Sequence, residues 1–221
     1  MSRRVRRWGL SGAFALVVLG VLAWSLRAPD EAQADGFDFY VLALSWSPTW
    51  CELEGDPRAR QCRDDADFGF VVHGLWPQFE RDYPEFCDHP ISYVPDSLVR
   101  DVIDLIPSAG LIGHQWRKHG TCSGLSPEAY FEMTRRAARI VSIPPALENI
   151  DSPVNADPNA IETAFRTANP GLPADGIAVT CDEGRLDEVR VCLTRELEFR
   201  RCVEVDRAAC RADSVIIPPT D

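Results

Sequence analysis

Residues 37–46 read FDFYVLALSW, an almost unbroken run of apolar residues that favour β-strands. A strand with apolar residues on both faces is typical of the centre of a sheet that is covered on both sides. Pro48 follows two residues later and ends the run. We therefore expect residues 37–46 to form a central strand on which the rest of the fold is built.

Three further segments are expected to extend this sheet. Residues 68–73 (FGFVVH) predict a second buried strand that ends on a histidine. Residues 177–181 and 186–193 predict a hairpin, because the turn sequence DEG lies between them. The second strand of that hairpin places three apolar side chains on one face: Val189, Val191 and Leu193.

Segments with helical spacing of apolar residues separate these strands. One covers residues 98–106 and stops at Pro107. Two others begin at Ser126 and Asp157, which are typical N-cap residues and are each followed by proline. Strands and helices do not alternate regularly, so the sequence predicts an α+β fold rather than a doubly wound parallel sheet.

Size and composition narrow the class of protein. A chain of 221 residues and 24.6 kDa accommodates one sizeable domain, and 45% hydrophobic with 26% charged residues excludes a wholly disordered or fibrous chain. The formal net charge of -11 argues against proteins that hold nucleic acid or an anionic membrane through a broadly positive surface.

Residues 1–34 have the pattern of an export signal. Four arginines, at positions 3, 4, 6 and 7, precede an uncharged run over residues 10–26, and Ala32-Gln33-Ala34 offers a cleavage site. We expect a cleaved signal peptide over residues 1–34 and one domain over residues 35–221, periplasmic or secreted and without stable membrane association. An uncleaved membrane anchor is the alternative. Without residues 1–34 the chain has 18 basic and 32 acidic residues, a net charge of -14.

All eight cysteines follow the expected signal. An even number of cysteines in an exported chain predicts disulfides, here four. A zinc site is the competing use of cysteine, but the chain has no Cys-x-x-Cys pair and no finger-like spacing between cysteine and histidine. The sequence therefore predicts a single disulfide-linked domain.

Three of the four histidines lie in two compact motifs. His73 belongs to FVVHGLWPQ (residues 70–78), and His114 and His119 belong to HQWRKHGTC (residues 114–122). The second motif also contains Lys118, the only lysine beside 22 arginines. On a helix, His114 lies one turn before Lys118 and Gln115 one turn before His119, so we expect these four side chains to face one cleft.

Two histidines and a fixed cation are the groups that cleave RNA without a metal. A general base takes the proton of the ribose 2'-hydroxyl, a general acid protonates the departing 5'-oxygen, and the cation stabilises the phosphoryl oxygens. Histidine suits both proton transfers because its ordinary pKa lies near 6.5. Trp76, in what reads as a turn bounded by glycine and proline, offers a face on which a base can stack.

Other readings of these histidines remain open. Any single histidine is more often structural, and His89, which belongs to no motif, is assigned that role. A zinc site formed by His73, His114 and His119 is conceivable, but no carboxylate adjoins them in the sequence as the usual partner of a metal-bound histidine.

HGLWP, followed downstream by KHGTC, resembles the two active-site segments of the T2 family of secreted acid ribonucleases. Residues 39–51 (FYVLALSWSPTWC) are similar to the opening strand of that family, and the last four cysteines resemble its C-terminal disulfide pairs. The resemblance covers essentially all of the chain after residue 34. It implies a central antiparallel sheet with packed helices.

The resemblance also implies an endoribonuclease that cleaves single-stranded RNA through a 2',3'-cyclic phosphate, with no cofactor, no metal and no obligate protein partner. His73 and His119 would be the acid–base pair, with His119 as base and His73 as acid, although spacing alone leaves their order open. Lys118 would stabilise the phosphoryl oxygens and His114 would position the phosphate. Two aromatic residues would bind the base: Trp76 and, as a looser candidate, Tyr83. The implied disulfides are Cys51–Cys62, Cys87–Cys122, Cys181–Cys210 and Cys192–Cys202.

The chain departs from the family at Gln115, where the family usually carries glutamate. An amide can form hydrogen bonds with phosphate but cannot exchange a proton near neutral pH. We expect slower rather than abolished turnover, and an acidic chain would need Lys118, Arg117 and Arg81 to form a local positive cleft. Two rival functions remain: a catalytically weak, exported RNA-binding or toxin-like relative, and a metal-dependent phosphodiesterase.

Overall fold

The structure is a computed structural model that describes residues 36–63 and 67–220. The expected signal peptide over residues 1–34 lies outside these described residues.

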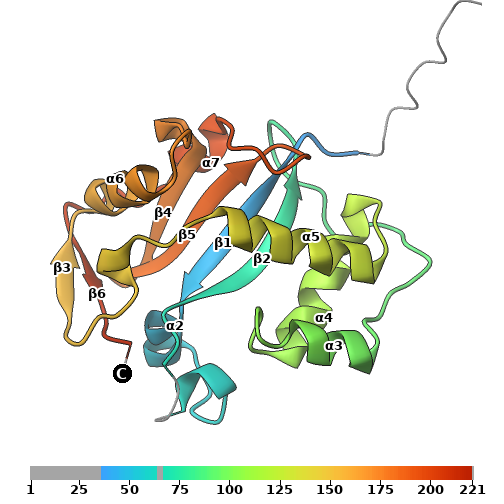
Figure 1. Ribbon diagram of the computed structural model, residues 1–221, viewed down its shortest axis with the longest axis horizontal. Helices are drawn as coiled ribbons and strands as arrows, with labels where there is room; N and C mark the ends of the chain where they lie inside the picture. The colour runs from blue at the N-terminus through green and yellow to red at the C-terminus, as the bar shows by residue number, and fades with distance from the viewer. Residues whose placement is uncertain (1–35, 64–66, 221) are drawn as a thin grey trace, which may run out of the picture. The chain divides into compact units, whose positions relative to one another are not determined.

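A mixed sheet organises the described part of the chain (Figure 1). Its strand order is β2-β1-β5-β6-β3, and β4 pairs with β5. The strands are β1 (Phe39–Trp46), β2 (Phe70–Gln78), β3 (Val154–Ala156), β4 (Ile177–Asp182), β5 (Arg185–Leu193) and β6 (Val215–Ile217). β1 lies between β2 and β5 and is antiparallel to both, which confirms the predicted central strand. The sheet is not antiparallel throughout as expected, because β5 meets β6 in parallel.

Local sequence signals predicted some of the bounds of the α-helices that are labelled in Figure 1. They are α2 (Ser47–Leu53), α3 (Asp96–Val102), α4 (Ala109–Lys118), α5 (Pro127–Ile140), α6 (Pro158–Ala168) and α7 (Val203–Arg207). The starts of α5 and α6 are confirmed, since the Ser126 hydroxyl accepts from the Ala129 amide and the Asp157 carboxylate from the Asn159 amide. The fold is therefore α+β, as predicted.

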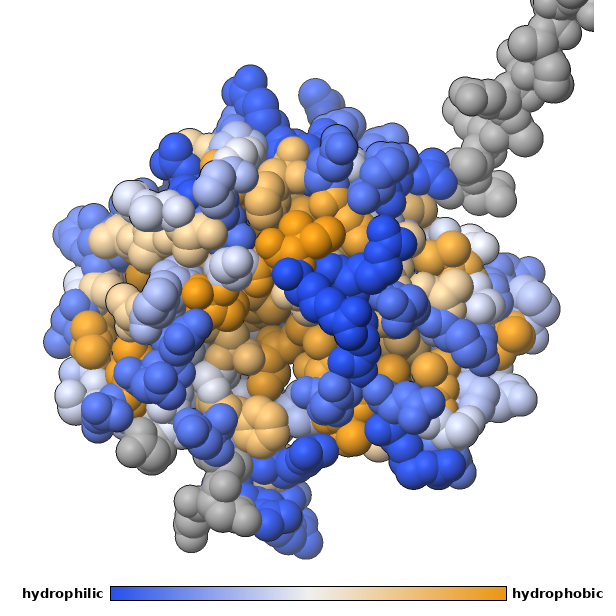
Figure 2. Space-filling model, in the orientation of Figure 1, coloured by the Kyte–Doolittle hydropathy of each residue, from blue (hydrophilic) through white to orange (hydrophobic). Residues whose placement is uncertain are grey.

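One face of the sheet carries the main core. Alternate residues of β1 (Tyr40, Leu42, Leu44 and Trp46) are buried in it. The amphipathic helix α5 crosses this face and contacts β1 and β2 (Figure 1). On the side shown in Figure 2, apolar side chains gather near the middle, over α5 and the strands, and hydrophilic side chains predominate around them. Helix α5 thus covers one face, and a pocket lies on the other, where Val205 of α7 packs near Val41 and Trp76.

The predicted hairpin of β4 and β5 is confirmed. The turn between the two strands contains Glu183 and Gly184, whose φ angles are 43° and 77°. Two successive residues with positive φ form the kind of turn whose twist matches that of a two-stranded antiparallel ribbon. The turn joins β4 to β5, and the separate pairing of β5 with β1 places Glu188 opposite Ser45 and Arg190 opposite Ala43.

Several boundaries predicted from local sequence are wrong. The second strand does not end at His73 but continues as β2 to Gln78, so Trp76 lies in a strand and not in a turn. Pairing with β1 over this whole length overrides the turn signals of Gly74 and Pro77. The first predicted helix ends at Val102 rather than at residue 106. The helices α2 and α7 and the short strands β3 and β6 were not predicted.

Four disulfides join the cysteines in the pairs that the resemblance implied. They are Cys51–Cys62, Cys87–Cys122, Cys181–Cys210 and Cys192–Cys202. None of the described helices has the length and apolar character needed to cross a membrane.

Candidate active site

A β-bulge directs His73 out of the sheet. Along the β1–β2 ladder, Ala43 pairs with Gly74 but Leu44 pairs with Val72, so His73 is an extra residue without a partner. A bulge of this kind bends the strand and redirects a side chain, and bulges are common beside active sites. His73 thereby lines a pocket of about 380 Å³.

Helix α4 brings the second motif to the same pocket. The hydroxyl of Ser108 caps its first turn by accepting from the Leu111 amide, and the helix ends at Lys118 with His119 as its C-cap. Four side chains from this end line the pocket together with His73: His114, Gln115, Lys118 and His119. The two motifs therefore meet, although 35 residues separate them in the sequence.

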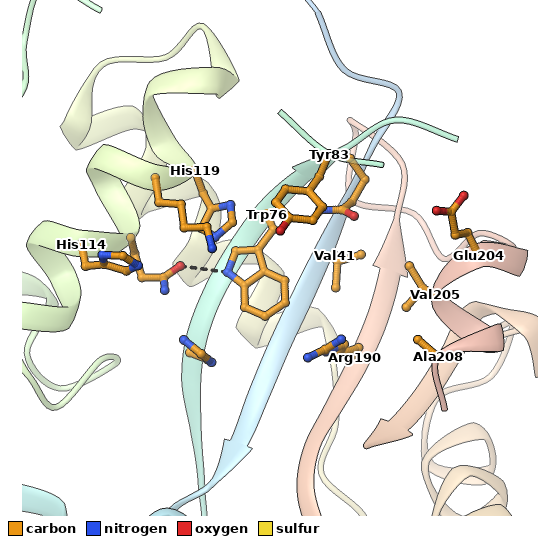
Figure 3. A pocket seen from close by; sticks show the side chains of 13 residues that line it. Val41, Trp76, Tyr83, His114, His119, Arg190, Glu204, Val205 and Ala208 are labelled. Carbon is orange, nitrogen blue, oxygen red and sulfur yellow. Dashed lines mark hydrogen bonds between the residues drawn. The ribbon is translucent and has the colours of Figure 1, made fainter. Parts of the chain in front are cut away.

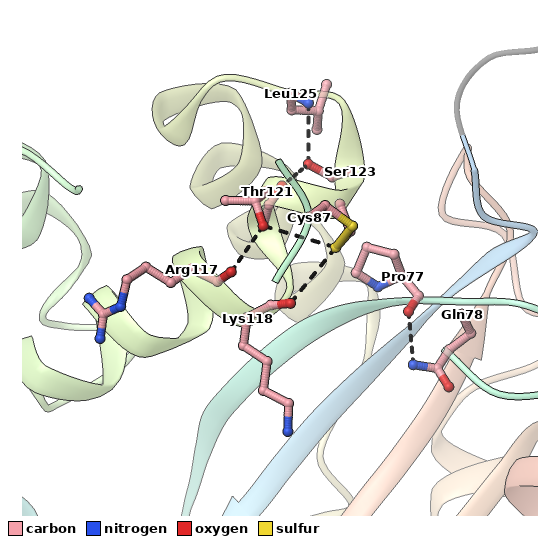
Figure 4. Close-up of a disulfide and its surroundings, with 10 residues drawn as sticks. Pro77, Gln78, Cys87, Arg117, Lys118, Thr121, Ser123 and Leu125 are labelled. Atoms are coloured by element: carbon pink, nitrogen blue, oxygen red, sulfur yellow. Dashed lines mark hydrogen bonds between the residues drawn. A yellow bond between two sulfur atoms is a disulfide. The ribbon is translucent and has the colours of Figure 1, made fainter. Parts of the chain in front are cut away.

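A disulfide holds the loop that follows β2 against the end of α4 (Figure 4). Cys87 is bonded to Cys122, and the Phe86 amide donates to the Lys118 carbonyl over 2.9 Å. The same loop carries Tyr83, whose ring lies 5.8 Å from the Lys118 ammonium nitrogen and is 47% exposed. The crosslink thus brings an accessible aromatic ring to the side of the pocket.

Trp76 lies between the two candidate catalytic histidines. Its indole N–H donates to Gln115 Oε1 over 2.8 Å, its ring is stacked on His119 with centroids 5.3 Å apart, and His73 meets it edge-on at 5.2 Å. The Arg190 guanidinium lies 5.4 Å from the ring centroid. Figure 3 shows His114 and His119 to one side of Trp76, and Arg190, Val205 and Ala208 to the other. Trp76 therefore packs within the site, and Tyr83 is the more exposed ring.

Gly74 is required by this packing, and its replacement gives a first prediction. A Cβ at Gly74 would collide with Gln115 Oε1 and would lie 2.5 Å from Trp76 Nε1. Gly74→Ala should lower the free energy of unfolding by about 1–3 kcal/mol, the usual effect of overpacking, and should displace the Gln115–Trp76 hydrogen bond. Denaturant unfolding measures the effect. Gly110→Ala, where the new methyl group has space, is the matched control, and equal stability of the two variants would contradict the prediction.

A buried carboxylate contacts His73. Glu188 on β5 is 4% exposed, and its Oε1 accepts from His73 Nδ1 over 2.5 Å. Burial alone would raise the pKa of Glu188, but the hydrogen bond and charge of His73 together with the Arg190 guanidinium lower that pKa to about 2. No carboxylate lies next to these histidines in the sequence, but the structure brings one into contact with His73, because β5 pairs with β1 and carries Glu188. The expectation that the histidines have no carboxylate partner is therefore wrong.

His119 has the opposite environment. It is 5% exposed, and its Nδ1 has no hydrogen-bond partner among the described residues. Burial, and after it the positive charges of Lys118 and of protonated His73 and His114, together lower the pKa of His119 to about 3. Burial, followed by Lys118 and Arg117, also lowers the pKa of His114. His119 is thus held neutral above strongly acidic pH.

The positive groups of the pocket differ from those expected. Lys118 lines it and pairs with Glu85 over 3.6 Å, and Arg190 lines it from β5. Arg117 and Arg81 are exposed and do not line it. In the part of the chain that the structure describes, no three His, Cys, Asp or Glu side chains are arranged to hold a metal ion.

Comparison with known families agrees with this arrangement. Residues 37–202 match the sequence profile of the Ribonuclease T2 family. The chain belongs to the ribonuclease T2 family. A ribonuclease of Aeromonas hydrophila is 39% identical over 121 residues, which cover 53% of this chain and 54% of that protein. The chain therefore spans about half the length of this relative.

Solved structures of similar proteins have the same fold. An RNase-related protein from Calystegia sepium superposes with a TM-score of 0.68 at 21% identity, covering 85% of this chain and all of that one. RNase NT in complex with 5'-AMP superposes with a TM-score of 0.66 at 22% identity, covering 84% of this chain and all of that one. At such identities the likeness concerns the T2 fold.

Sequence reasoning missed the contribution of β5 to the site. Its alternation was recognised only for the apolar face, but Glu188 and Arg190 occupy the other face and reach His73 and Trp76. An acidic and a basic residue two positions apart on a buried strand were the available signal. The remaining wall of the pocket was also missed and includes Val41, Gln78, Glu204, Val205 and Ala208.

Proposed function

We propose that this chain is an endoribonuclease that cleaves single-stranded RNA by transphosphorylation and leaves a 2',3'-cyclic phosphate. The observation that carries the proposal is the convergence of His73, His119 and Lys118 on one pocket from two distant motifs. Family membership supports the same reaction class. Two imidazoles and one ammonium group are sufficient for this reaction, so no step requires a metal or an organic cofactor.

The environments of the two histidines support His119 as the base and His73 as the acid. His119 is buried beside Lys118, which favours its neutral form, so it acts as the base that takes the 2'-hydroxyl proton. The 2'-oxygen then attacks the adjacent phosphorus, and the bond from phosphorus to the 5'-oxygen breaks. His73, whose Nδ1 donates to the ionised carboxylate of Glu188, protonates that leaving oxygen.

The other residues bind the substrate. Lys118 stabilises the negative phosphoryl oxygens, and His114, one turn earlier on α4, positions the phosphate. Arg190 is a second cation in the pocket. The exposed ring of Tyr83 is the surface on which a base stacks, while Trp76 supports the histidine pair from within. Bases of single-stranded RNA are free to stack in this way, unlike those of a duplex.

Digestion of RNA by the purified protein in excess chelator tests the proposal. We expect cleavage to continue and mass spectrometry of the fragments to show 2',3'-cyclic phosphate ends. Cleavage that stops with chelator would instead support a metal-dependent phosphodiesterase. Absence of cleavage together with measurable RNA binding would support a catalytically weak binding relative.

Gln115 provides a prediction about rate. Its side chain is 1% exposed and accepts from Trp76, so it lies against the pocket but cannot exchange a proton. Gln115→Glu keeps the acceptor for the indole and adds an acidic group, and kcat should therefore rise about 2- to 10-fold, a small share of what a general acid or base contributes. Steady-state cleavage of a dinucleotide measures it, and an unchanged or lower kcat would show that residue 115 has another role.

We also propose that the chain is exported. The charged and then apolar pattern of residues 1–34 supports this, as do four disulfides, which persist in oxidising compartments. N-terminal sequencing of the protein recovered from culture medium or periplasm tests both export and cleavage near residue 34.

A further inference from the structure

Both carboxylate oxygens of Glu188, which is buried beside His73, form hydrogen bonds. Its Oε1 accepts from His73 Nδ1 over 2.5 Å and from the Ser45 hydroxyl over 3.1 Å. Its Oε2 accepts from Arg190 through Nε at 2.9 Å and Nη2 at 2.8 Å. Burying a carboxylate is unfavourable unless donors and a cation compensate it, and here both oxygens are bonded. The group is therefore held ionised in one orientation.

An ionised carboxylate fixes the form of the histidine it contacts. It can only accept hydrogen bonds, so His73 Nδ1 must carry a proton. Nε2 is then the ring nitrogen that exchanges a proton in the pocket. Arg190 on β5, Lys118 and His114 on α4, and His119 at the C-cap of α4 are positive or ionisable neighbours that disfavour a charged His73. Glu188 is the contact that favours it.

We propose that Glu188 is a positioning residue for His73, which keeps Nε2 available in the pocket and stabilises the imidazolium that protonates the leaving oxygen. This inference rests on the proposed function. The negative charge that contacts His73 comes from β5, which lies on the opposite side of β1 from the strand that carries His73.

Glu188→Gln tests the inference because the amide retains an acceptor for Nδ1–H and removes the charge. We expect kcat at neutral pH to fall about tenfold with KM nearly unchanged, and the alkaline limb of the pH–rate profile to move about one unit lower, since one unit corresponds to a tenfold change in protonation. In a His73→Ala background the same substitution should have no further effect on kcat. An equal loss in both backgrounds, or an unshifted profile in a folded variant, would overturn the inference.

Nitrogen NMR of His73 gives a readout that needs no activity. In the purified wild-type protein the shifts should show a proton on Nδ1, and in Glu188→Gln the titration midpoint should move to lower pH. Asp187→Asn, a change of the neighbouring carboxylate that bonds Thr180 instead, should leave His73 unaltered. If the wild type cleaves no RNA, the proposed function fails and NMR still decides on Glu188. If Glu188→Gln does not fold, a wild-type tautomer with the proton on Nε2 would overturn the inference.

Discussion

Replacing either His119 or His73 by alanine should lower kcat about 10²- to 10⁴-fold, the usual contribution of a general base or acid. Each variant removes one of the two proton transfers while Lys118, His114 and the second histidine remain. Rates of dinucleotide cleavage measure the loss. Both variants should remain folded at the assay temperature, which thermal unfolding by circular dichroism verifies.

His89→Ala is the matched control for these variants. Like His119, His89 contacts a tryptophan, since its ring meets Trp116 edge-on at 5.0 Å, but it does not line the pocket. Its loss should leave kcat within about twofold, because it touches no reacting group. Full activity of either His73→Ala or His119→Ala would refute the acid–base pair.

The pH dependence of the wild-type enzyme follows from the same environments. A base must be unprotonated, and because burial lowers the pKa of His119 to about 3, activity should persist in acid and fall only as the pH drops through about 3. A general acid must carry its proton, so the pH–rate profile should also have a limb on the alkaline side. In a His119→Asn variant that retains activity, the fall in rate near pH 3 should be absent from the pH–rate profile. A fall that persists there would show that a group other than His119 causes it.

Local signals predicted the elements whose boundaries depend on nearby residues. The Ser126 and Asp157 caps act within a single turn, so α5 and α6 begin where the sequence indicates. The same holds for the hairpin turn at Glu183 and Gly184. Trp76 was misplaced because Gly74 and Pro77 signal a turn locally, and only pairing with β1 shows that the segment is a strand.

The site shows the same division between local and long-range information. HGLWP and KHGTC contain the histidines and Lys118, so the main groups were visible as motifs. Glu188 and Arg190 were not visible, because their place beside His73 depends on the register of β5 against β1. The low pKa of His119 depends on its burial against Trp76, and residue spacing in the sequence does not predict that burial. The sequence thus identified the catalytic residue types, but the surroundings that set the protonation of the histidines became known only from the folded structure.

Lys118→Met should lower kcat about 10²- to 10³-fold, because a fixed donor aimed at developing charge contributes about that much. Lys118 is the only lysine, and the guanidinium of Arg190 is held by Glu188, so Arg190 is not free to replace it. Arg117→Met removes the adjacent but exposed cation and should leave kcat nearly unchanged. A similar loss in both variants would indicate a general effect of charge rather than a specific role of Lys118.

Removing the charge of Glu85, which contacts the ammonium group of Lys118, should raise activity rather than lower it. It pairs with Lys118 over 3.6 Å and is half exposed, so substrate phosphate must compete with it. Exposed ion pairs contribute about 0–1 kcal/mol, so Glu85→Gln should raise kcat/KM by at most about fivefold, and the gain should shrink in high salt. Glu80→Gln removes an equal charge from the same loop but at the Arg200 pair, and it should therefore raise kcat/KM less. Equal gains in the two variants would mean that the overall negative charge, and not the contact with Lys118, limits binding of RNA.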